Sequence, residues 1–349
     1  MSKRIGVVVC NLGGPDSLAA VEPFLFNLFN DPAIIALPGP ARWLIAKIIS
    51  KTRNKKSQGN YAKMGGASPI LGETKKQAEA LEAVLAGRPV FAGARPKVVI
   101  AMRHWAPSTQ DAAAQLRAEG IEDVIVLPLY PQYSSTTTGS AVKEFARHWK
   151  KPFRTICCYP DLDGVARGYA ETIIETWRNA GAPDNLHVLY SAHGLPESIV
   201  AKGDPYVAQC QRTAAAIDAH LPKSFRTKLC YQSRVGPAKW VGPSTDACIL
   251  ELAKMKAPVL VCPIAFVSEH VETLVDLDIE TAALAKENGA PLYLRAPALG
   301  LRESFISGLA DLIEASLIKP CGIFSSTEEG PCNAGSKLCP RKNPAVVAV

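Results

Sequence analysis

The amino-acid sequence predicts an α/β protein with two similar domains, each built on a parallel sheet flanked by helices. Short apolar runs rich in β-branched residues alternate with longer stretches of helical period along the 349 residues. This is the pattern of buried parallel strands joined by crossover helices. The length and the 48% apolar composition are enough for two moderate cores. We therefore expect two Rossmann-like domains in tandem, with an active cleft between them.

The predicted strands fall equally in the two halves of the chain. In order they are Ile5–Asn11, Val98–Met102, Val124–Leu129, Arg154–Cys157, Leu186–Ser191, Lys228–Gln232, Val259–Ile264 and Leu292–Arg295. The same alternation in both halves suggests an ancient duplication. We place the first domain at 1–165, the second at 166–318 and a tail without periodicity at 319–349.

A long insertion at 17–68 interrupts the first domain. Its second part, LPGPARWLIAKIISKTRNKK, alternates apolar residues such as Trp43 and Ile48 with basic residues such as Lys47. This pattern predicts a short basic amphipathic helix. Three roles stay open for 36–51: a helix packed on its own domain, contact with a membrane surface, or an apolar lip for a lipid-soluble substrate.

Polar and aromatic segments follow the predicted strands directly. They are NLGG, RHW and YPQYSS in the first half, and SAHG, YQSRVG and AFVSEH in the second. In open parallel sheets, ligands bind beyond the carboxyl ends of the strands. These segments should therefore meet in one cleft between the domains.

His193 lies in LYSAHGLPES, at the end of a predicted strand and directly before Gly194. A histidine in such a place is suited to accept a proton or bind a metal, because imidazole is neutral near pH 7 and the glycine allows close approach. On this segment alone, a purely structural histidine is the alternative.

The segment PIAFVSEHVETLVDLDIE predicts a strand followed by a helix. Glu272, Asp276 and Glu280 stand four residues apart on that helix and share one face, where like charges repel each other. Such a face is turned to solvent or to a cation, and Glu269 and His270 add ligands suited to a divalent transition metal. The crowding predicts that at least one carboxyl group has a raised pKa.

Composition and charge limit the classes of partner that the protein is expected to bind. A net charge of +7 suits an anionic partner, but the sequence has no zinc-finger spacing, RNP-like signature or basic block, so we expect no nucleic-acid partner. No apolar run approaches the roughly 20 residues that span a bilayer, and the N-terminus does not resemble a signal peptide. We expect a cytoplasmic protein in which most of the ten cysteines are reduced core residues.

Six ordered segments resemble the signature segments of the ferrochelatase family. They are NLGGPDS (Asn11–Ser17), GGASPI (Gly65–Ile70), LPLYPQYSSTTTGS (Leu127–Ser140), SAHGLPESIVAKGDPY (Ser191–Tyr206), YQSRVGPAKWVGP (Tyr231–Pro243) and CPIAFVSEHVETLVDLDIE (Cys262–Glu280). The resemblance covers nearly the whole chain up to about residue 318. It implies a chelatase-like fold and a lyase that inserts Fe(II) into protoporphyrin IX with release of two protons.

The resemblance also implies roles for single residues. His193 matches the family's active-site histidine and Glu272 its partner at the metal, while Asp276 and Glu280 match an acidic series that passes protons or hydrated metal along the helix. Residues that look like the lining of the macrocycle pocket are Tyr61, Ser68, Arg103, His104, Tyr130, Pro196, Val235, Trp240 and Phe266. The planar guanidinium of Arg103 is suited to a carboxylate, and His104 stands where some members carry Tyr.

Two other interpretations stay open. A related chelatase would act on coproporphyrin or another tetrapyrrole, and we favour protoporphyrin because the apolar insertion suits a substrate with fewer carboxylates. A protein of another class, a non-catalytic porphyrin or haem carrier or an iron–sulfur redox sensor, needs no route for protons. The acidic series therefore argues against that class.

The tail contains Cys321, Cys332 and Cys339. Some ferrochelatases hold a [2Fe–2S] cluster with tail cysteines and one body cysteine, and the resemblance implies such a cluster here, although the tail spacing is not itself a metal signature. In animal members the body ligand lies in the YPQYS segment, where this chain has Ser135. Cys157 and Cys158 are the available substitutes, and we favour Cys158. Free thiols in a disordered tail are the alternative, and cluster-bearing relatives also suggest a homodimer.

Overall fold

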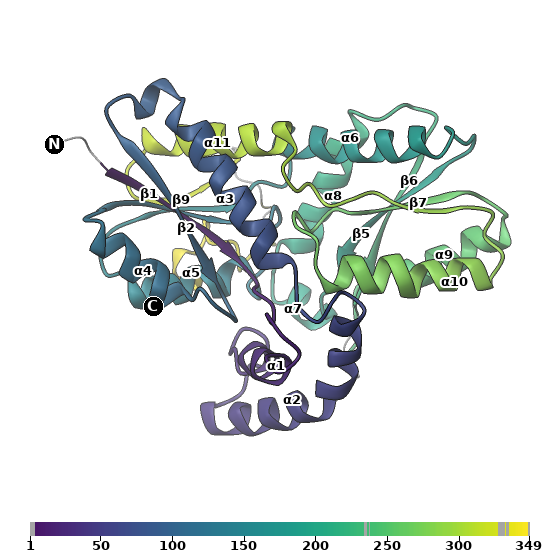
Figure 1. The fold of residues 1–349 in the computed structure, drawn as a ribbon, viewed down its shortest axis with the longest axis horizontal. Helices are drawn as coiled ribbons and strands as arrows, with labels where there is room; N and C mark the ends of the chain where they lie inside the picture. The colour runs from purple at the N-terminus through teal and green to yellow at the C-terminus, as the bar shows by residue number, and fades with distance from the viewer. Residues whose placement is uncertain (1–3, 234–235, 237, 327–331, 333–334, 348–349) are drawn as a thin grey trace.

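The computed structural model describes residues 4–233, 236, 238–326, 332 and 335–347. Two sheets lie side by side with helices packed on them, which confirms the predicted α/β class (Figure 1). All the predicted strands are present. The strands are β1 (Arg4–Asn11), β2 (Arg95–Met102), β3 (Asp123–Pro128), β4 (Arg154–Cys158), β5 (His187–His193), β6 (Arg226–Gln232), β7 (Val259–Pro263), β8 (Tyr293–Arg295) and β9 (Gly322–Ser325).

Both sheets are parallel throughout. The first has the order β2-β1-β3-β4-β9 and the second the order β6-β5-β7-β8. Strand β9 corrects our expectation that regular structure ends before the tail, because Gly322–Ser325 pairs with β4 at the edge of the first sheet. A strand at the edge of a sheet leaves backbone N–H and C=O groups unpaired. Here β9 pairs with these groups of β4.

The helices of the first half are α1 (Val21–Phe29), α2 (Gly39–Ala62), α3 (Ile70–Ala86), α4 (Thr109–Ala118) and α5 (Thr138–His148), with the 3₁₀ turn η1 (Pro89–Phe91). Those of the second half are α6 (Asp163–Asn179), α7 (Glu197–Ala201), α8 (Tyr206–Asp218), α9 (Thr245–Lys254), α10 (Ala282–Glu287) and α11 (Glu303–Leu317), with the π-helix η2 (Glu272–Thr281) and the 3₁₀ turn η3 (Pro344–Val346). This order of strands and helices places the carboxyl ends of the parallel strands together at one edge of each sheet.

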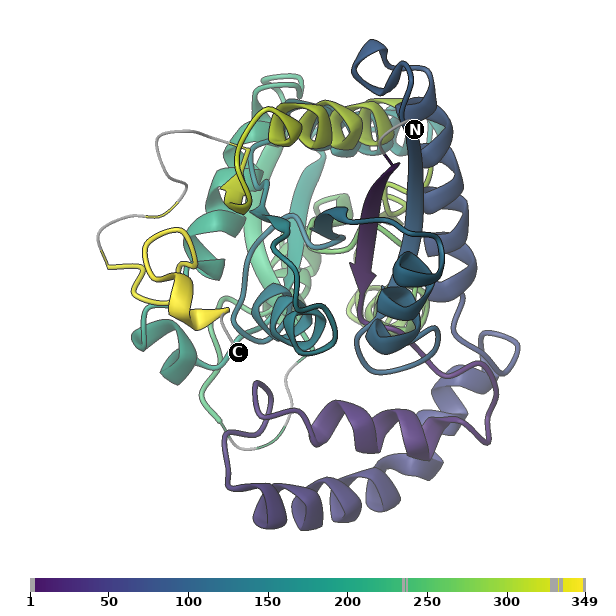
Figure 2. The same cartoon turned by 90° about the vertical axis from the view of Figure 1, so that its left-hand side faces the viewer.

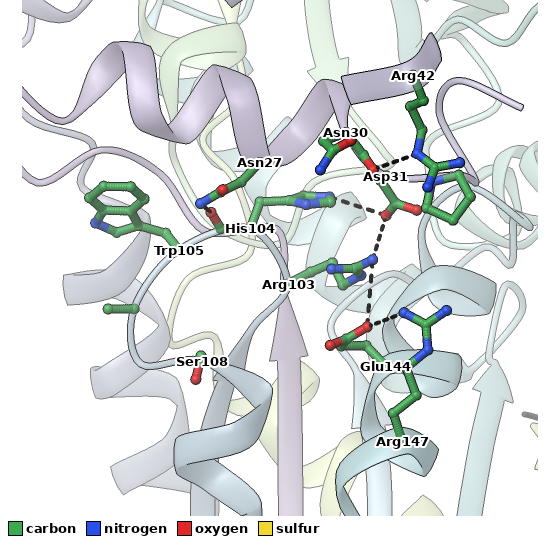
Figure 3. Close-up of a pocket in the computed structure, with 12 residues that line it drawn as sticks. Asn27, Asn30, Asp31, Arg42, Arg103, His104, Trp105, Ser108, Glu144 and Arg147 are labelled. Carbon is green, nitrogen blue, oxygen red and sulfur yellow. Dashed lines mark hydrogen bonds and ion pairs between the residues drawn. The ribbon is translucent and has the colours of Figure 1, made fainter. Parts of the chain in front are cut away.

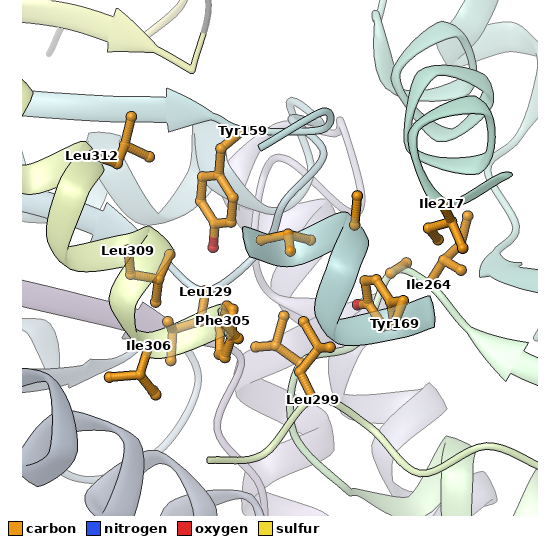
Figure 4. Packing of buried hydrophobic residues seen from close by; sticks show 14 of the residues in the cluster. Leu129, Tyr159, Tyr169, Ile217, Ile264, Leu299, Phe305, Ile306, Leu309 and Leu312 are labelled. Carbon is orange, nitrogen blue, oxygen red and sulfur yellow. The ribbon is translucent and has the colours of Figure 1, made fainter. Parts of the chain in front are cut away.

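One apolar core joins the two sheets. Ile125 of β3 and Leu260 of β7 belong to it. Tyr169 of α6 and Phe305 of α11 lie in the same cluster (Figure 4). Helices α6 and α11 pack so closely that a Cβ atom at Gly164 would overlap the backbone of α11. The two domains therefore share a buried junction, and the boundary that we placed at residue 165 falls within the first turn of α6.

The insertion forms α1 and α2, which lie side by side at one end of the molecule (Figure 2). Phe24 and Phe29 of α1 pack with Tyr61 of α2 in a separate apolar cluster. The predicted helix is thus confirmed, and α2 is longer than the segment that predicted it, but its apolar side chains Trp43, Leu44 and Ile48 are exposed rather than packed on the domain. We call α1 and α2 the lip.

Candidate active site

His193 ends β5, where its side chain is 38% exposed. Its Nδ1 atom lies 2.6 Å from the carbonyl oxygen of Gly194. Because a carbonyl oxygen only accepts hydrogen bonds, Nδ1 carries the hydrogen and Nε2 keeps a free lone pair. Nε2 lies 3.6 Å from Oε1 of Glu272. His193 is therefore held in the tautomer that accepts a proton or a metal beside a carboxylate.

The acidic series lies on the π-helix η2 rather than on the α-helix that the spacing predicts. A π-turn holds slightly more than four residues, so carboxylates four apart still follow one another along one face. Glu272 begins the series and Glu280, whose side chain is 53% exposed, ends it towards solvent. Asp276 lies between them, and burial together with the charges of Glu272 and Glu280 raises its pKa to about 7. The expected raised carboxyl pKa is confirmed at Asp276.

Ser233 links two carboxylates of the series. Its Oγ lies 3.1 Å from Oε2 of Glu272 and 3.4 Å from Oδ2 of Asp276, so the hydroxyl can donate to either. The backbone of Ser233 has φ of 63°, in the left-handed region that glycine and asparagine favour. Sequence reasoning missed this residue, although its place directly after β6 in the YQS segment was a signal.

A chain of hydrogen bonds connects strands β5 and β6 to the backbone at the start of the acidic series. The Ser191 hydroxyl donates to the Gln232 side chain at 2.6 Å, and the Gln232 amide donates to the backbone oxygen of Glu272 at 3.2 Å. Strands β5 and β6 therefore fix where η2 begins.

Aromatic side chains surround His193. The ring centroids of Trp240 and Phe266 lie 6.3 and 6.5 Å from that of His193. Pro196 forms an isolated bridge with Trp240. Tyr61 of the lip is buried, and burial followed by the charges of Glu272 and Asp276 raises its pKa. These four predicted pocket residues thus gather at the same site.

Val235 lies outside the described residues, so its expected role in the pocket stays a prediction. Ser68 is half-buried, and its backbone N–H donates to the Pro15 carbonyl at 2.8 Å. It holds the NLGGPDS segment against the start of α3.

Glu269 and His270 differ in their surroundings. Glu269 accepts hydrogen bonds from Arg295 at 2.6 Å and from the Ala298 backbone at 2.9 Å, which gives it a structural role. The His270 ring is tilted by 53° against that of Phe266, with ring centroids 4.4 Å apart, and burial lowers the pKa of His270. Its Nδ1 is buried without a hydrogen-bond partner among the described residues. His270 is therefore the neutral neighbour of the site.

Arg103 is already paired inside the protein. Its Nη2 lies 2.9 Å from Oδ2 of Asp31, and its Nε donates to Ser140 at 2.7 Å (Figure 3). Asp31 follows α1, so this buried pair ties the lip to β2 and α5. Arg103 thus already has an internal carboxylate as a partner, and its expected contact with a substrate carboxylate stays a prediction.

His104 is almost fully buried beside this pair, and burial followed by the charge of Arg103 lowers its pKa to about 3. A hollow of about 600 Å³ lies next to it, lined in part by Arg42, Arg147 and Glu144 (Figure 3). Burial raises the pKa of Tyr130, and Arg103 opposes that rise, which places Tyr130 beside Arg103.

The group around His193 is the candidate reaction centre. None of the residues that line the 600 Å³ hollow belongs to the group around His193 and Glu272. Among the residues that the structure describes, that group combines a free imidazole lone pair, a series of carboxylates and aromatic side chains. Proton transfer needs such a combination within hydrogen-bond reach.

A second group of side chains gathers where the tail meets the body. The amide of Gln209 on α8 lies 3.4 Å from the Sγ atoms of both Cys158 and Cys332. Cys332 also contacts Cys339, whose pKa is lowered to about 6 by the hydrogen bond from Cys332 and by nearby backbone N–H groups. Three of the predicted cluster cysteines are thus together, whereas Cys321 is exposed.

Within the described part of the chain, no three His, Cys, Asp or Glu side chains already form a finished metal-binding arrangement. At the thiol group, Gln209 stands between Cys158 and Cys332. At His193, the carboxylates extend away along η2. Both places offer side chains that could act as metal ligands, but these side chains would have to move closer together to bind one metal.

Comparison with known proteins agrees with this geometry. A family model described as Ferrochelatase matches residues 4–317. The chain is 52% identical over 339 residues to the ferrochelatase of Phenylobacterium zucineum (strain HLK1), covering 97% of this chain and 96% of that relative. It is 50% identical over 346 residues to the ferrochelatase of Caulobacter vibrioides (strain NA1000 / CB15N), covering 97% and 98%.

A solved structure shares the architecture. The protein SirB from Bacillus subtilis with Fe3+ matches with a TM-score of 0.52 at 12% identity, covering 90% of this chain and 95% of that chain. At this identity the likeness concerns the fold alone. It agrees with two parallel-sheet domains in a chelatase-like arrangement.

Proposed function

This chain belongs to the ferrochelatase family, and from that premise we propose that it inserts Fe(II) into protoporphyrin IX, releasing two protons. The observation that carries the proposal is the meeting of His193, Glu272 and the aromatic side chains at one place. As a chelatase of this kind it acts as a lyase. The two substrates are the porphyrin and the ferrous ion.

His193 would act first, because its Nε2 lone pair is free to take a pyrrole proton. Glu272 stabilises the imidazolium that forms and offers a carboxylate ligand to the incoming iron, and His193 can add Nε2 as a second ligand once its proton has been passed on. The Ser233 hydroxyl then connects Glu272 with Asp276, whose pKa of about 7 lets it take up and release protons near neutral pH. Glu280 delivers them to solvent.

The aromatic side chains would hold the macrocycle. Trp240, Phe266 and Tyr61 supply apolar faces to a flat porphyrin beside His193. An enzyme accelerates a reaction when it binds the transition state better than the ground state. A pocket that favours a bent macrocycle therefore presents the nitrogen lone pairs to the metal.

The test is anaerobic turnover of protoporphyrin IX with Fe(II), followed by loss of porphyrin fluorescence, for wild type and His193→Ala. We expect near-total loss of activity in His193→Ala. The matched control is His187→Ala at the other end of β5, which should keep activity. Stoichiometric binding without turnover by wild type would favour the porphyrin or haem carrier, and an active His193→Ala enzyme would move the proton acceptor to Glu272.

The choice of protoporphyrin IX over coproporphyrin is supported by the lip, whose exposed side chains include Trp43, Leu44 and Ile48. Apolar surface favours the substrate with fewer carboxylates. Comparing kcat/KM for the two porphyrins checks this choice. A higher value for coproporphyrin would contradict it.

We also propose that the lip touches a membrane surface through 36–51, so that the protein works in the cytoplasm at the inner membrane. Trp43, Leu44 and Ile48 are each more than half exposed, with Lys47 on the same helix. Basic amphipathic helices bind anionic bilayers in this way. No helix in the described ranges is long and apolar enough to cross a bilayer.

Sedimentation with vesicles that contain an anionic lipid tests this contact. We expect Trp43→Ser with Ile48→Ser to reduce binding. The control is Ile318→Ser, because Ile318 is 83% exposed but lies outside the lip. Equal binding by the lip variant and wild type would contradict the proposal.

A [2Fe–2S] cluster is the proposed cofactor. Cys158, Cys332 and Cys339 supply thiols that gather around Gln209. The Tyr133 hydroxyl is buried without a partner among the described residues. Burial, then the charge of Asp204, then those of Cys157, Cys339 and Cys158 raise its pKa, so it lies near these three thiols. An unpaired buried donor beside several thiols fits a missing acceptor such as a cluster sulfur. When bound, the cluster supplies one-electron redox chemistry.

Visible absorption and the iron and sulfide content of anaerobically purified protein test the cluster. The absence of cluster absorption, iron and sulfide would support the alternative, in which the tail cysteines are free thiols. We propose a homodimer as well, as in the cluster-bearing members that the sequence resembles, and sedimentation velocity gives the oligomeric state.

A further inference from the structure

Cys157 lies unexpectedly close to Cys158. Neighbouring residues of a regular strand point to opposite faces of the sheet. In β4 the pairing with β9 shifts register between Ile156 and Cys158, and such an irregularity re-aims side chains. The two Sγ atoms lie 3.6 Å apart, and both residues pack in the same apolar cluster.

This separation fits two ligands of one metal ion. Two thiolates on a tetrahedral metal with metal–sulfur bonds of about 2.3 Å lie about 3.8 Å apart. The pair in β4 is therefore already near the spacing that one iron of a cluster requires. On the other side of Gln209, Cys332 contacts Cys339 and forms a second pair.

Cys321 does not reach this place. It directly precedes Gly322, which pairs in parallel with Arg154, so Cys321 stands opposite Phe153 at the far end of β4. Five residues separate Phe153 from Cys158, which is roughly 16 Å along a strand. Cys321 is exposed and lines a separate hollow with Trp149 and Phe153.

Ser135 is already hydrogen-bonded to a carboxylate. Its backbone N–H and its hydroxyl both donate to Oδ2 of Asp204 at 2.7 Å. Asp204 is buried, and the donors from Ser134 and Ser135 satisfy the carboxylate. The position that carries the body ligand in animal members is thus built here as a hydrogen-bonded link between the first domain and the α7–α8 loop.

We propose that Cys157, Cys158, Cys332 and Cys339 form the ligand set of the cluster, with one pair from β4 and one from the tail, and that Cys321 is not a ligand. This assignment rests on the proposed cluster. Gln209 is a positioning residue in it, because its amide reaches one sulfur of each pair and its side-chain oxygen accepts from the Tyr133 backbone at 2.7 Å. The set ties the first sheet, the tail and α8 together.

The experiment compares full-length wild type, Cys157→Ala and Cys321→Ala, purified anaerobically, by visible absorption and by iron and acid-labile sulfide per chain. We expect Cys157→Ala to lose the cluster and Cys321→Ala to keep the wild-type content. Quenching of protoporphyrin fluorescence shows that each variant still has a folded body. A Cys321→Ala protein without cluster would overturn the assignment even if Cys157→Ala does not fold.

The other outcomes separate this assignment from the cluster itself. A cluster retained in Cys157→Ala overturns the assignment alone. Wild type without iron and sulfide overturns the cluster and the assignment with it. Zinc in place of iron and sulfide, lost in Cys157→Ala and kept in Cys321→Ala, would replace the cluster but support the same four thiols, since Cys₄ sites also suit zinc.

A second readout follows from Gln209. N–H donors to cluster sulfurs raise the reduction potential, so Gln209→Leu should bind a cluster with a more negative midpoint potential in a dye-mediated titration. An unchanged potential would exclude Gln209 from contact with the sulfurs.

Discussion

At the scale of single residues, the candidate active site depends on neighbouring carboxyl groups whose negative charges repel one another. Asp276 lies between Glu272 and Glu280, and the Ser233 hydroxyl is the neutral donor that reaches two of the carboxylates. Without such a donor the repulsion between neighbours would be larger. The left-handed backbone of Ser233 is a local strain that the surrounding strands maintain.

The raised pKa of Asp276 predicts how stability depends on pH. Below about pH 4 the carboxyl is protonated in both the folded and the unfolded chain, so it has no effect. Between about pH 4 and about pH 7 the unfolded chain ionises this carboxyl while the folded chain keeps it protonated, so the folded state loses up to about 4 kcal/mol of stability over that range and no more above it. Asp276→Asn should therefore stabilise the protein at pH 8 much more than at pH 5.

Urea unfolding at the two pH values measures this difference. Turnover completes the test, because the same variant should lose activity if Asp276 passes protons. An Asp276→Asn enzyme with the wild-type pH–rate profile would remove Asp276 from the proton route.

At the scale of elements, the lip and η2 meet end to end. Val271, directly before η2, packs on the apolar cluster of the lip. Lys63 follows α2, and its Nζ lies 3.7 Å from Oε1 of Glu280. A cation therefore stands at the exposed end of the acidic series, where a divalent metal would first meet the protein.

Lys63→Gln should lower the KM for Fe(II) by a factor between about 1.4 and 5, because an exposed ion pair is worth roughly 0.2–1 kcal/mol and the metal no longer competes with it. The KM for porphyrin should stay unchanged. Lys228→Gln is the matched control, since Lys228 pairs with Glu251 away from the series. Equal effects of the two variants would indicate a change in overall charge rather than a local competition.

At the scale of the whole molecule, buried glutamines hold the two domains at a fixed distance. The Gln77 amide on α3 donates to the carbonyl oxygens of Val267 and Gly300, and its oxygen accepts from Ser268. All three partners belong to the second domain. Gln132 makes a similar link to Thr213 and to the Ile264 carbonyl.

Gln77→Leu should destabilise the protein by about 3 kcal/mol, because it leaves buried carbonyl groups without donors. Activity should fall as well, since the Val267 segment adjoins Phe266. Gln115→Leu is the control, because the Gln115 amide is exposed and donates to Glu119, directly after α4. Thermal unfolding and turnover of both variants decide whether the link matters for the site.

Strands β1 to β8 could be predicted from sequence because they are short, mostly apolar runs between stretches of helical period, whereas β9 was missed because it lies in the tail, where that alternation stops. His193 and Glu272 could be found because they follow such runs and match family segments. Ser233 was missed: its place directly after β6 marked it as a neighbour of the site, but nothing in its local sequence shows a left-handed backbone or two carboxylates from a distant helix. The pairing of Arg103 with Asp31 was missed for the same reason: its partner lies across an insertion.

The sequence by itself determined the two parallel sheets, the amphipathic lip and the place of His193 at the end of a strand, because these depend on the local order of apolar and polar residues. Only the tertiary structure decided that the acidic series winds as a π-helix, that Arg103 serves the lip, and that Cys157 rather than Cys321 stands beside Cys158. Those outcomes depend on contacts between residues far apart in the chain. The local order of apolar and polar residues gives no information about the energies of such contacts.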